Sequence, residues 1–208
     1  VAMASSVEIC NTGLAYLGAE SIAALDSSTK TARACRTFYP QARDYLLSLF
    51  DWPFARKLMK LEALDITEWT IPSDLYAYTL PSDCLVPRSI HPRGTRVKWE
   101  VQDGKLLTSV YPVYLYYTRK IETSGAFSVG FIEVLSVLLA SKLCMPITAD
   151  KALADKLRQE FSSVFSYVTS NEANIGNEWV HHDIDPDSDR FVNPDGDGVG
   201  YVEMYEGT

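Results

Sequence analysis

The fold is decided in residues 8–57, which read EICNTGLAYLGAESIAALDSSTKTARACRTFYPQARDYLLSLFDWPFARK. A first helix is predicted to begin after Ser5, because Ser5 and Glu8 form a capping box in which each side chain binds a backbone N–H of the first turn. Its apolar stripe consists of Val7, Cys10, Leu14 and Leu17. Gly18 is the expected end of this helix, since glycine readily adopts the left-handed conformation that follows a helix.

A second, longer helix is predicted from about Thr29 to Phe50, where apolar residues recur at steps of three and four. Its apolar stripe consists of Cys35, Phe38, Tyr39, Ala42, Tyr45, Leu46 and Leu49. Arg33, Arg36 and Arg43 are expected to lie off this stripe, on a face turned to solvent or to a partner. Pro40 lies inside the pattern and predicts a kink or a break, because proline removes a helical hydrogen bond.

Residues 55–121 carry strand patterns instead of helical ones. The segment Phe54–Leu64 alternates weakly and fits either a strand or a helical extension. An aromatic strand is predicted over Leu75–Leu80, a hairpin over Arg96–Ser109 with its turn at Asp103-Gly104, and a long strand over Val113–Ile121. We expect these strands to form one small antiparallel sheet.

Helical periodicity returns after residue 122. An apolar helix is predicted from Phe127 to Met145, ended by Pro146, and its interior charges favour a buried helix over a membrane span. Thr148 is the expected cap of a fourth helix, which fades near residues 174–177. The apolar stripe of that helix consists of Leu153, Leu157, Phe161, Val164 and Val168, and its outward residues are Lys151, Asp155, Arg158 and Glu160.

The order of these elements predicts an α+β fold. Residues 1–54 and 122–177 are expected to pack as a bundle of four helices, and residues 55–121 to form an inserted small antiparallel β-domain. Residues 178–208 are expected to form an extended acidic C-terminal arm.

Charge is divided unevenly along the 208 residues. The arm holds nine Asp and Glu against one Arg, which accounts for the whole net charge of −8, and the rest of the chain is neutral. A neutral body argues against general nucleic-acid binding, which requires a basic face for the phosphates. The first ten residues, VAMASSVEIC, lack the basic and apolar regions of a signal peptide.

The arm contains the run HHDIDPDSDRFVNPDGDGVGY, residues 181–201, which suggests a metal site at first sight. A calcium-dependent binding module using Asn193–Met204 is one alternative, because oxygen-bearing residues and a glycine occupy several positions of an EF-hand loop. Met204, however, stands where that loop requires glutamate, so an arm that binds a protein partner is favoured. Its apolar anchors are Trp179, Phe191, Tyr201 and Tyr205.

Candidate catalytic and metal-binding residues are few. Asp74 and Asp83 are the carboxylates of an alternative function, a hydrolase acting on envelope polysaccharide or peptidoglycan, but both follow Pro-Ser, and a role in turns is the better interpretation. His91 is expected in a loop, apart from any nucleophile. The four cysteines, Cys10, Cys35, Cys84 and Cys144, have no spacing that predicts a disulfide framework or a zinc site.

Residues 8–57 resemble the N-terminal half of the tail tubular protein A family, the head-to-tail adaptors of short-tailed bacteriophages. The helix end at Leu14–Gly18, the Leu46-Leu47 pair and the corner Trp52–Ala55 carry this resemblance. Four residues of the second helix also match: Ala32, Cys35, Tyr39 and Arg43. The later stretch YAYTLPSDCL and the two C-terminal helices extend the resemblance from about Ser5 to Asn174.

The resemblance implies a structural protein of the virion, made in the host cytoplasm, with no enzymatic activity, cofactor or membrane association. Such a protein forms a ring, commonly of twelve copies, between the portal and the tail nozzle, and DNA passes through the ring without specific binding. The second helix, with Arg33, Arg36 and Arg43, is the expected subunit interface. The arm is expected to bind the portal or a neighbouring subunit.

Overall fold

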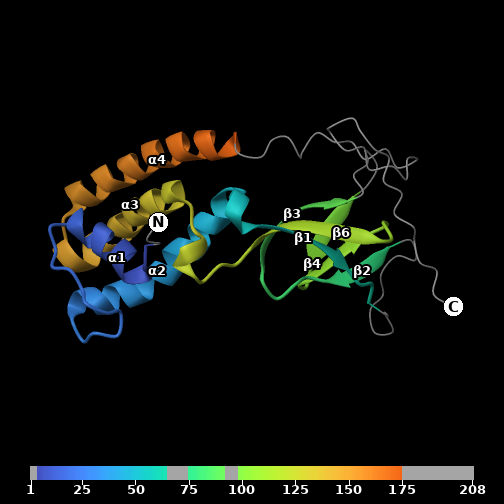
Figure 1. The fold of residues 1–208 in the computed structure, drawn as a ribbon, viewed down its shortest axis with the longest axis horizontal. Coiled ribbons are helices and arrows are strands. Elements are labelled where there is room, and N and C mark those ends of the chain that lie inside the picture. The colour runs from blue at the N-terminus through green and yellow to red at the C-terminus, as the bar shows by residue number, and fades with distance from the viewer. Residues whose placement is uncertain (1–3, 65–74, 92–97, 175–208) are drawn as a thin grey trace, which may run out of the picture.

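The computed structural model describes residues 4–64, 75–91 and 98–174. Four α-helices gather at one end of the molecule and six strands at the other (Figure 1). The chain forms two helices, then the strands, then two further helices, so the β-region is an insertion in the helical part. The predicted α+β class with four helices is confirmed.

The first helix, α1, spans Ser6–Ala15 and begins as predicted. The Ser5 hydroxyl accepts a hydrogen bond from the Glu8 N–H at 3.2 Å, and the Glu8 carboxylate accepts one from the Ser5 N–H at 2.6 Å. Gly18 follows with a φ of 62°, a left-handed conformation that glycine adopts without strain. The predicted capping box and terminal glycine are both confirmed.

The second helix, α2, spans Lys30–Leu49 and is capped by the Thr29 hydroxyl, which accepts from the Ala32 N–H at 3.2 Å. It continues through Pro40 as one helix, so the break predicted as one outcome there does not occur. Pro40 is exposed, whereas Tyr39 beside it is buried. The packing of one face of α2 against its neighbours therefore outweighs the hydrogen bond that proline removes.

Helices α3, Val129–Thr148, and α4, Lys151–Ala173, both differ slightly from the predicted bounds. Pro146 lies inside α3, which ends at Ala149 with a left-handed φ of 56°. Asp150 caps α4, not Thr148, by accepting from the Leu153 N–H at 3.0 Å. The Thr148 hydroxyl is engaged elsewhere, because it donates to the Cys144 carbonyl at 2.8 Å inside α3.

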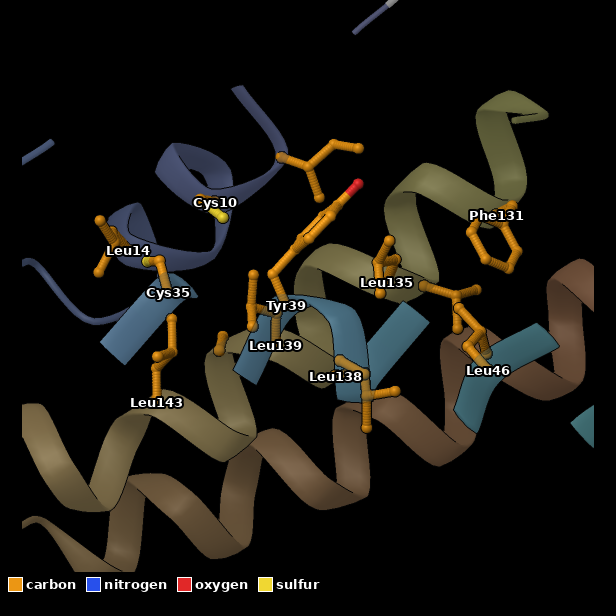
Figure 2. Close-up of a cluster of buried hydrophobic side chains, with 14 of the residues drawn as sticks. Cys10, Leu14, Cys35, Tyr39, Leu46, Phe131, Leu135, Leu138, Leu139 and Leu143 are labelled. Carbon is orange, nitrogen blue, oxygen red and sulfur yellow. The ribbon is translucent and has the colours of Figure 1, made fainter. Parts of the chain in front are cut away.

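The helical core lies where α3 packs against the other three helices (Figure 2). Side chains of α1, α2 and α3 meet there, and those labelled in the view include Cys10, Leu14, Cys35, Tyr39, Leu46, Phe131 and Leu139. Among the described residues, α3 is the one helix long and apolar enough to cross a membrane by length and composition, and 61% of its most apolar window is buried inside the fold. The predicted burial of this helix is confirmed.

In the described part of the chain, six strands form two antiparallel sheets, where one sheet was predicted. The first has the order β1-β6-β3 and consists of β1 (Arg56–Leu61), β3 (Cys84–His91) and β6 (Val113–Arg119). The second has the order β2-β5-β4 and consists of β2 (Tyr76–Thr79), β4 (Trp99–Gln102) and β5 (Lys105–Thr108). The ambiguous segment before Leu64 is thus mainly a strand, and the predicted hairpin turn at Asp103-Gly104 joins β4 to β5.

The prediction of a single sheet was wrong, because β6 pairs with β1 and β3 and with no strand of the hairpin, and β3 was not recognised as a strand. Pro87 interrupts its strand pattern, and the register shifts beside Pro87 where β3 pairs with β6. Proline is tolerated on such an edge strand, where half of the backbone N–H groups point away from the ladder. The predicted loop position of His91 was also wrong, since His91 is the last residue of β3. A second hydrophobic cluster, including Leu61, Tyr78 and Leu115, lies between the sheets.

Candidate interaction surfaces

The bundle and the strands are joined by Arg88, a half-buried residue of β3 that the sequence analysis did not single out. Its guanidinium donates to the carbonyls of Ser48 at 3.1 Å and Phe50 at 2.9 Å, where α2 ends. It also donates to the Thr118 hydroxyl of β6 at 2.9 Å. Arg88 thus provides hydrogen-bond donors and a positive charge to backbone carbonyls that have no helical partner at the C-terminal end of α2.

A second contact at this junction centres on Asp51, directly after α2. The Tyr116 hydroxyl of β6 donates to the Asp51 carboxylate at 3.0 Å, and Arg56 Nε lies 3.2 Å from the same oxygen. Burial, followed by the negative charge of Asp51, raises the pKa of Tyr116 to about 12. Tyr116 therefore stays protonated near neutral pH and remains a donor. These contacts fix the strands at a defined position against the bundle.

Asp83, one of the two candidate catalytic carboxylates, is bound by its neighbours. Lys57 Nζ lies 2.9 Å from Asp83 Oδ2, and the Tyr117 hydroxyl donates to Oδ1 at 2.7 Å. Burial opposes ionisation of Asp83, but the hydrogen bonds from Lys57 and Tyr117 outweigh it and lower its pKa. A general acid requires the opposite shift, so Asp83 in this geometry does not suit that role. Asp74 lies outside the described residues.

The three arginines of α2 do not share one face. Arg33 and Arg36 are exposed as predicted, and neither forms an ion pair with a residue that the structure describes. Arg43 is buried, with 6% of its surface exposed, and its Nε lies 2.7 Å from Asp44 Oδ1. The prediction that Arg43 lies off the buried stripe was wrong, because contacts outside α2 decide which of its residues are covered. Lys120, beyond β6, also approaches Asp44 at 3.8 Å.

Residues 57–60 of β1 are exposed on both faces of the strand, and among the described residues one edge of β1 is uncovered. Its sequence is RKLMKL, and 56% of Leu58 and 43% of Met59 are exposed. Strand β6 covers one edge, and no strand in residues 4–64, 75–91 or 98–174 covers the other. Lys57 is paired with Asp83, whereas Lys60 has no ion pair with a described residue. A strand of this kind offers backbone hydrogen bonds and side-chain contacts to another chain.

An open pocket of about 430 Å³ lies at the end of β1. It is lined by Lys60, Leu61, Glu62, Ala63, Tyr111 and Pro112. The ring of Tyr111, which is 67% exposed, lies 5.4 Å from that of Tyr76. The pocket therefore extends the exposed surface of β1 with an aromatic wall, and the sequence offered no local signal for it because its residues come from separate segments.

The four cysteines are free thiols, and Cys10, Cys35 and Cys144 are buried. Cys10 on α1 and Cys35 on α2 both lie in the helical core (Figure 2). A hydrogen bond with Cys35 and burial both raise the pKa of the Cys10 thiol, so it stays protonated near neutral pH. In the part of the chain that the structure describes, no three His, Cys, Asp or Glu side chains gather as a metal site would.

The predicted arm lies outside the described residues. This applies to the anchors Trp179, Phe191, Tyr201 and Tyr205 and to the candidate calcium loop Asn193–Met204.

Comparison with models of known protein families finds no match to this chain, and comparison with curated protein sequences finds none either.

Proposed function

We propose that the protein is a head-to-tail adaptor of a bacteriophage, a structural ring that joins the portal to the tail nozzle and surrounds the path of the DNA. The observation that carries this proposal is the resemblance of residues 8–57 to the tail tubular protein A family. The matched residues have definite structural roles in this fold. Cys35, Tyr39 and Leu46 are buried in the bundle, and the Trp52 indole donates to the Leu46 carbonyl at 2.9 Å.

The surface of the protein suits an assembly subunit. Arg33 and Arg36 are exposed on α2, at the opposite end of the chain's sequence from the acidic arm. Exposed apolar side chains lie on β1 and on both ends of α3, including Leu58, Val129 and Met145. Rings of identical subunits use two different surfaces on each copy, so separate exposed regions of this kind support the proposal.

The charge distribution also supports a channel that DNA passes through. The chain before residue 178 has equal numbers of acidic and basic residues. Each basic contact to phosphate adds electrostatic affinity, so a neutral ring retains DNA less strongly than a basic one. In this proposal the arm binds the portal or the neighbouring subunit through Trp179, Phe191, Tyr201 and Tyr205.

The direct test is to mix the purified protein with the portal protein encoded in the same phage genome. We expect a ring of identical copies attached to one end of the portal, visible by electron microscopy and countable by native mass spectrometry. A protein that stays monomeric and leaves the portal bare at micromolar concentrations contradicts the proposal. A chain truncated after Asn177 should keep its melting temperature but lose binding to the portal or to other copies in the ring. If the truncated chain forms the same complexes as the full chain, the proposed role of the arm is contradicted.

A further inference from the structure

The edge of β1 that no described strand covers and the end of the acidic arm have complementary sequences. Residues 57–60 of β1 read KLMK, and residues 203–206 near the C-terminus read EMYE. Both segments place two apolar residues between two charges, and the charges are opposite. We propose that Tyr201–Glu206 of one copy adds as an antiparallel strand to this edge of β1 in a neighbouring copy.

The register follows from the two sequences. In an antiparallel pair with Lys60 opposite Glu203, Leu58 is opposite Tyr205 and Met59 is opposite Met204. Opposite charges and apolar pairs facing each other across strands are favourable. The same register brings Lys57 opposite Glu206, and Lys57 already contacts the Asp83 carboxylate. Of the two lysines, Lys60 gains the more favourable charge interaction, because it has no ion pair among the described residues.

The composition of the donor segment suits a strand. Residues 201–206 read YVEMYE, and the aromatic and β-branched residues in it favour pleated structure. Glycines at 200 and 207 flank the segment. On the acceptor side, backbone groups of β1 that point away from β6 offer the hydrogen bonds on which strand addition depends.

The pocket at the end of β1 fits the same arrangement. The register brings Tyr201 opposite Glu62, which lines that pocket together with Tyr111. A tyrosine placed there meets an aromatic wall and an open volume. Residues 175–200, between α4 and the segment, span at most roughly 90 Å when fully extended, so they provide a long connection for the donor.

This inference rests on the proposed function for its ring geometry, but its test requires no portal. Lys60→Glu places a second carboxylate opposite Glu203, and Glu203→Lys places a second ammonium group opposite Lys60. Each single variant should therefore associate about three- to tenfold more weakly than the unmodified chain. The double variant carrying both changes should regain association. The double variant with Lys60→Glu and Glu206→Lys should not regain association, because Glu206 is not opposite Lys60 in the antiparallel register. Restored association in this variant overturns that register.

Mixing the two single variants separates a neighbour's arm from the chain's own. Each variant repels copies of itself, whereas copies of the two different variants attract each other, so an equimolar mixture should associate more tightly than either protein alone. Sedimentation velocity measures this, and hydrogen exchange should show protection of the β1 amides that grows with protein concentration. Lys156→Glu, on the exposed face of α4, is the matched control and should change neither measurement.

Two results overturn the inference. One is a mixture that behaves as the average of its components. The other is protection of β1 that is independent of protein concentration, which indicates that the chain's own arm occupies the edge. If mixing restores association but no portal complex forms, strand addition stands and the adaptor role fails. If portal-bound rings form normally with Lys60→Glu, the adaptor role stands and strand addition fails.

Discussion

The guanidinium of Arg88 on β3 lies 2.9 Å from the carbonyl oxygen of Phe50, the residue that follows α2. This one hydrogen bond connects parts of the chain 38 residues apart. Arg88 also donates to Ser48 and Thr118, so its side chain binds the end of the helix and the central strand of the first sheet together. The position of the strands against the bundle depends on this residue.

Arg88→Ala should therefore lower the free energy of unfolding by about 2–3 kcal/mol, because it removes charge-assisted hydrogen bonds and leaves half-buried carbonyls without donors. Urea denaturation followed by circular dichroism measures the loss. Arg158→Ala is the matched control: Arg158 forms an exposed ion pair with Asp155 within α4, so its removal should change stability by less than about 0.5 kcal/mol. Equal effects of the two substitutions contradict the role assigned to Arg88.

Helix α3 packs closely on α4 at Gly130. A Cβ added at that position lies 2.6 Å from Cγ1 of Val168, a stiff β-branched side chain that cannot rotate away freely. Gly130→Ala should destabilise the protein by about 1–2 kcal/mol. Urea denaturation measures this loss as the change in midpoint concentration multiplied by m, the dependence of the free energy of unfolding on urea concentration. The double variant with Val168→Ala should lose less free energy of unfolding than the two single variants lose together. The reason is that the new methyl group at position 130 fills the space that the shortened side chain at 168 leaves. Additive effects refute this close contact.

Asp83 should give the stability of the protein a measurable pH dependence. Its pKa is lowered from the ordinary value of 3.8, so its contribution is complete above that value and is lost as pH falls through the lower pKa of the folded state. Asp83→Asn should reduce the free energy of unfolding at pH 7 by less than about 1 kcal/mol, because the Lys57 pair is partly exposed. The difference from the unmodified protein should narrow below about pH 4. Asp155→Asn is the exposed control, and a difference that stays constant down to about pH 3 contradicts the prediction.

Local signals in the sequence account for what could be predicted of the fold. The capping box at Ser5, the Thr29 start of α2 and the Asp103-Gly104 turn each depend on residues within four positions of one another. Strand β3 could not be found in this way, because Pro87 hides its pattern and its partner β6 begins more than twenty residues later. Whether strands form one sheet or two is decided by such distant pairing.

The candidate surfaces were predicted less well for the same reason. The helical periodicity of α2 indicated that Arg43 is exposed, yet neighbours outside α2 bury it. The roles of Arg88 and Tyr116 depend on partners 30 to 65 residues away, so no local motif indicates them. Exposure of Arg33 and Arg36 was predictable because the predicted stripe holds in the first half of α2, where Cys35 and Tyr39 are buried, whereas Tyr45 and Leu49 in the second half are exposed.

The last prediction concerns these two arginines, the candidate subunit interface. Arg33→Glu with Arg36→Glu should leave the melting temperature within about 2 °C of the unmodified protein, because both side chains are exposed and form no ion pair among the described residues. Self-association should weaken at least about tenfold, since like-charge contacts at an interface cost several kcal/mol, and mass photometry across a concentration series measures this. Arg158→Glu with Lys156→Glu carries the same charge change on α4 and should associate normally. Arg43→Glu should instead unfold the protein at a lower temperature, because it places an acid beside Asp44 in a buried position. Unchanged association of the Arg33 and Arg36 variant excludes this face of α2 from the ring.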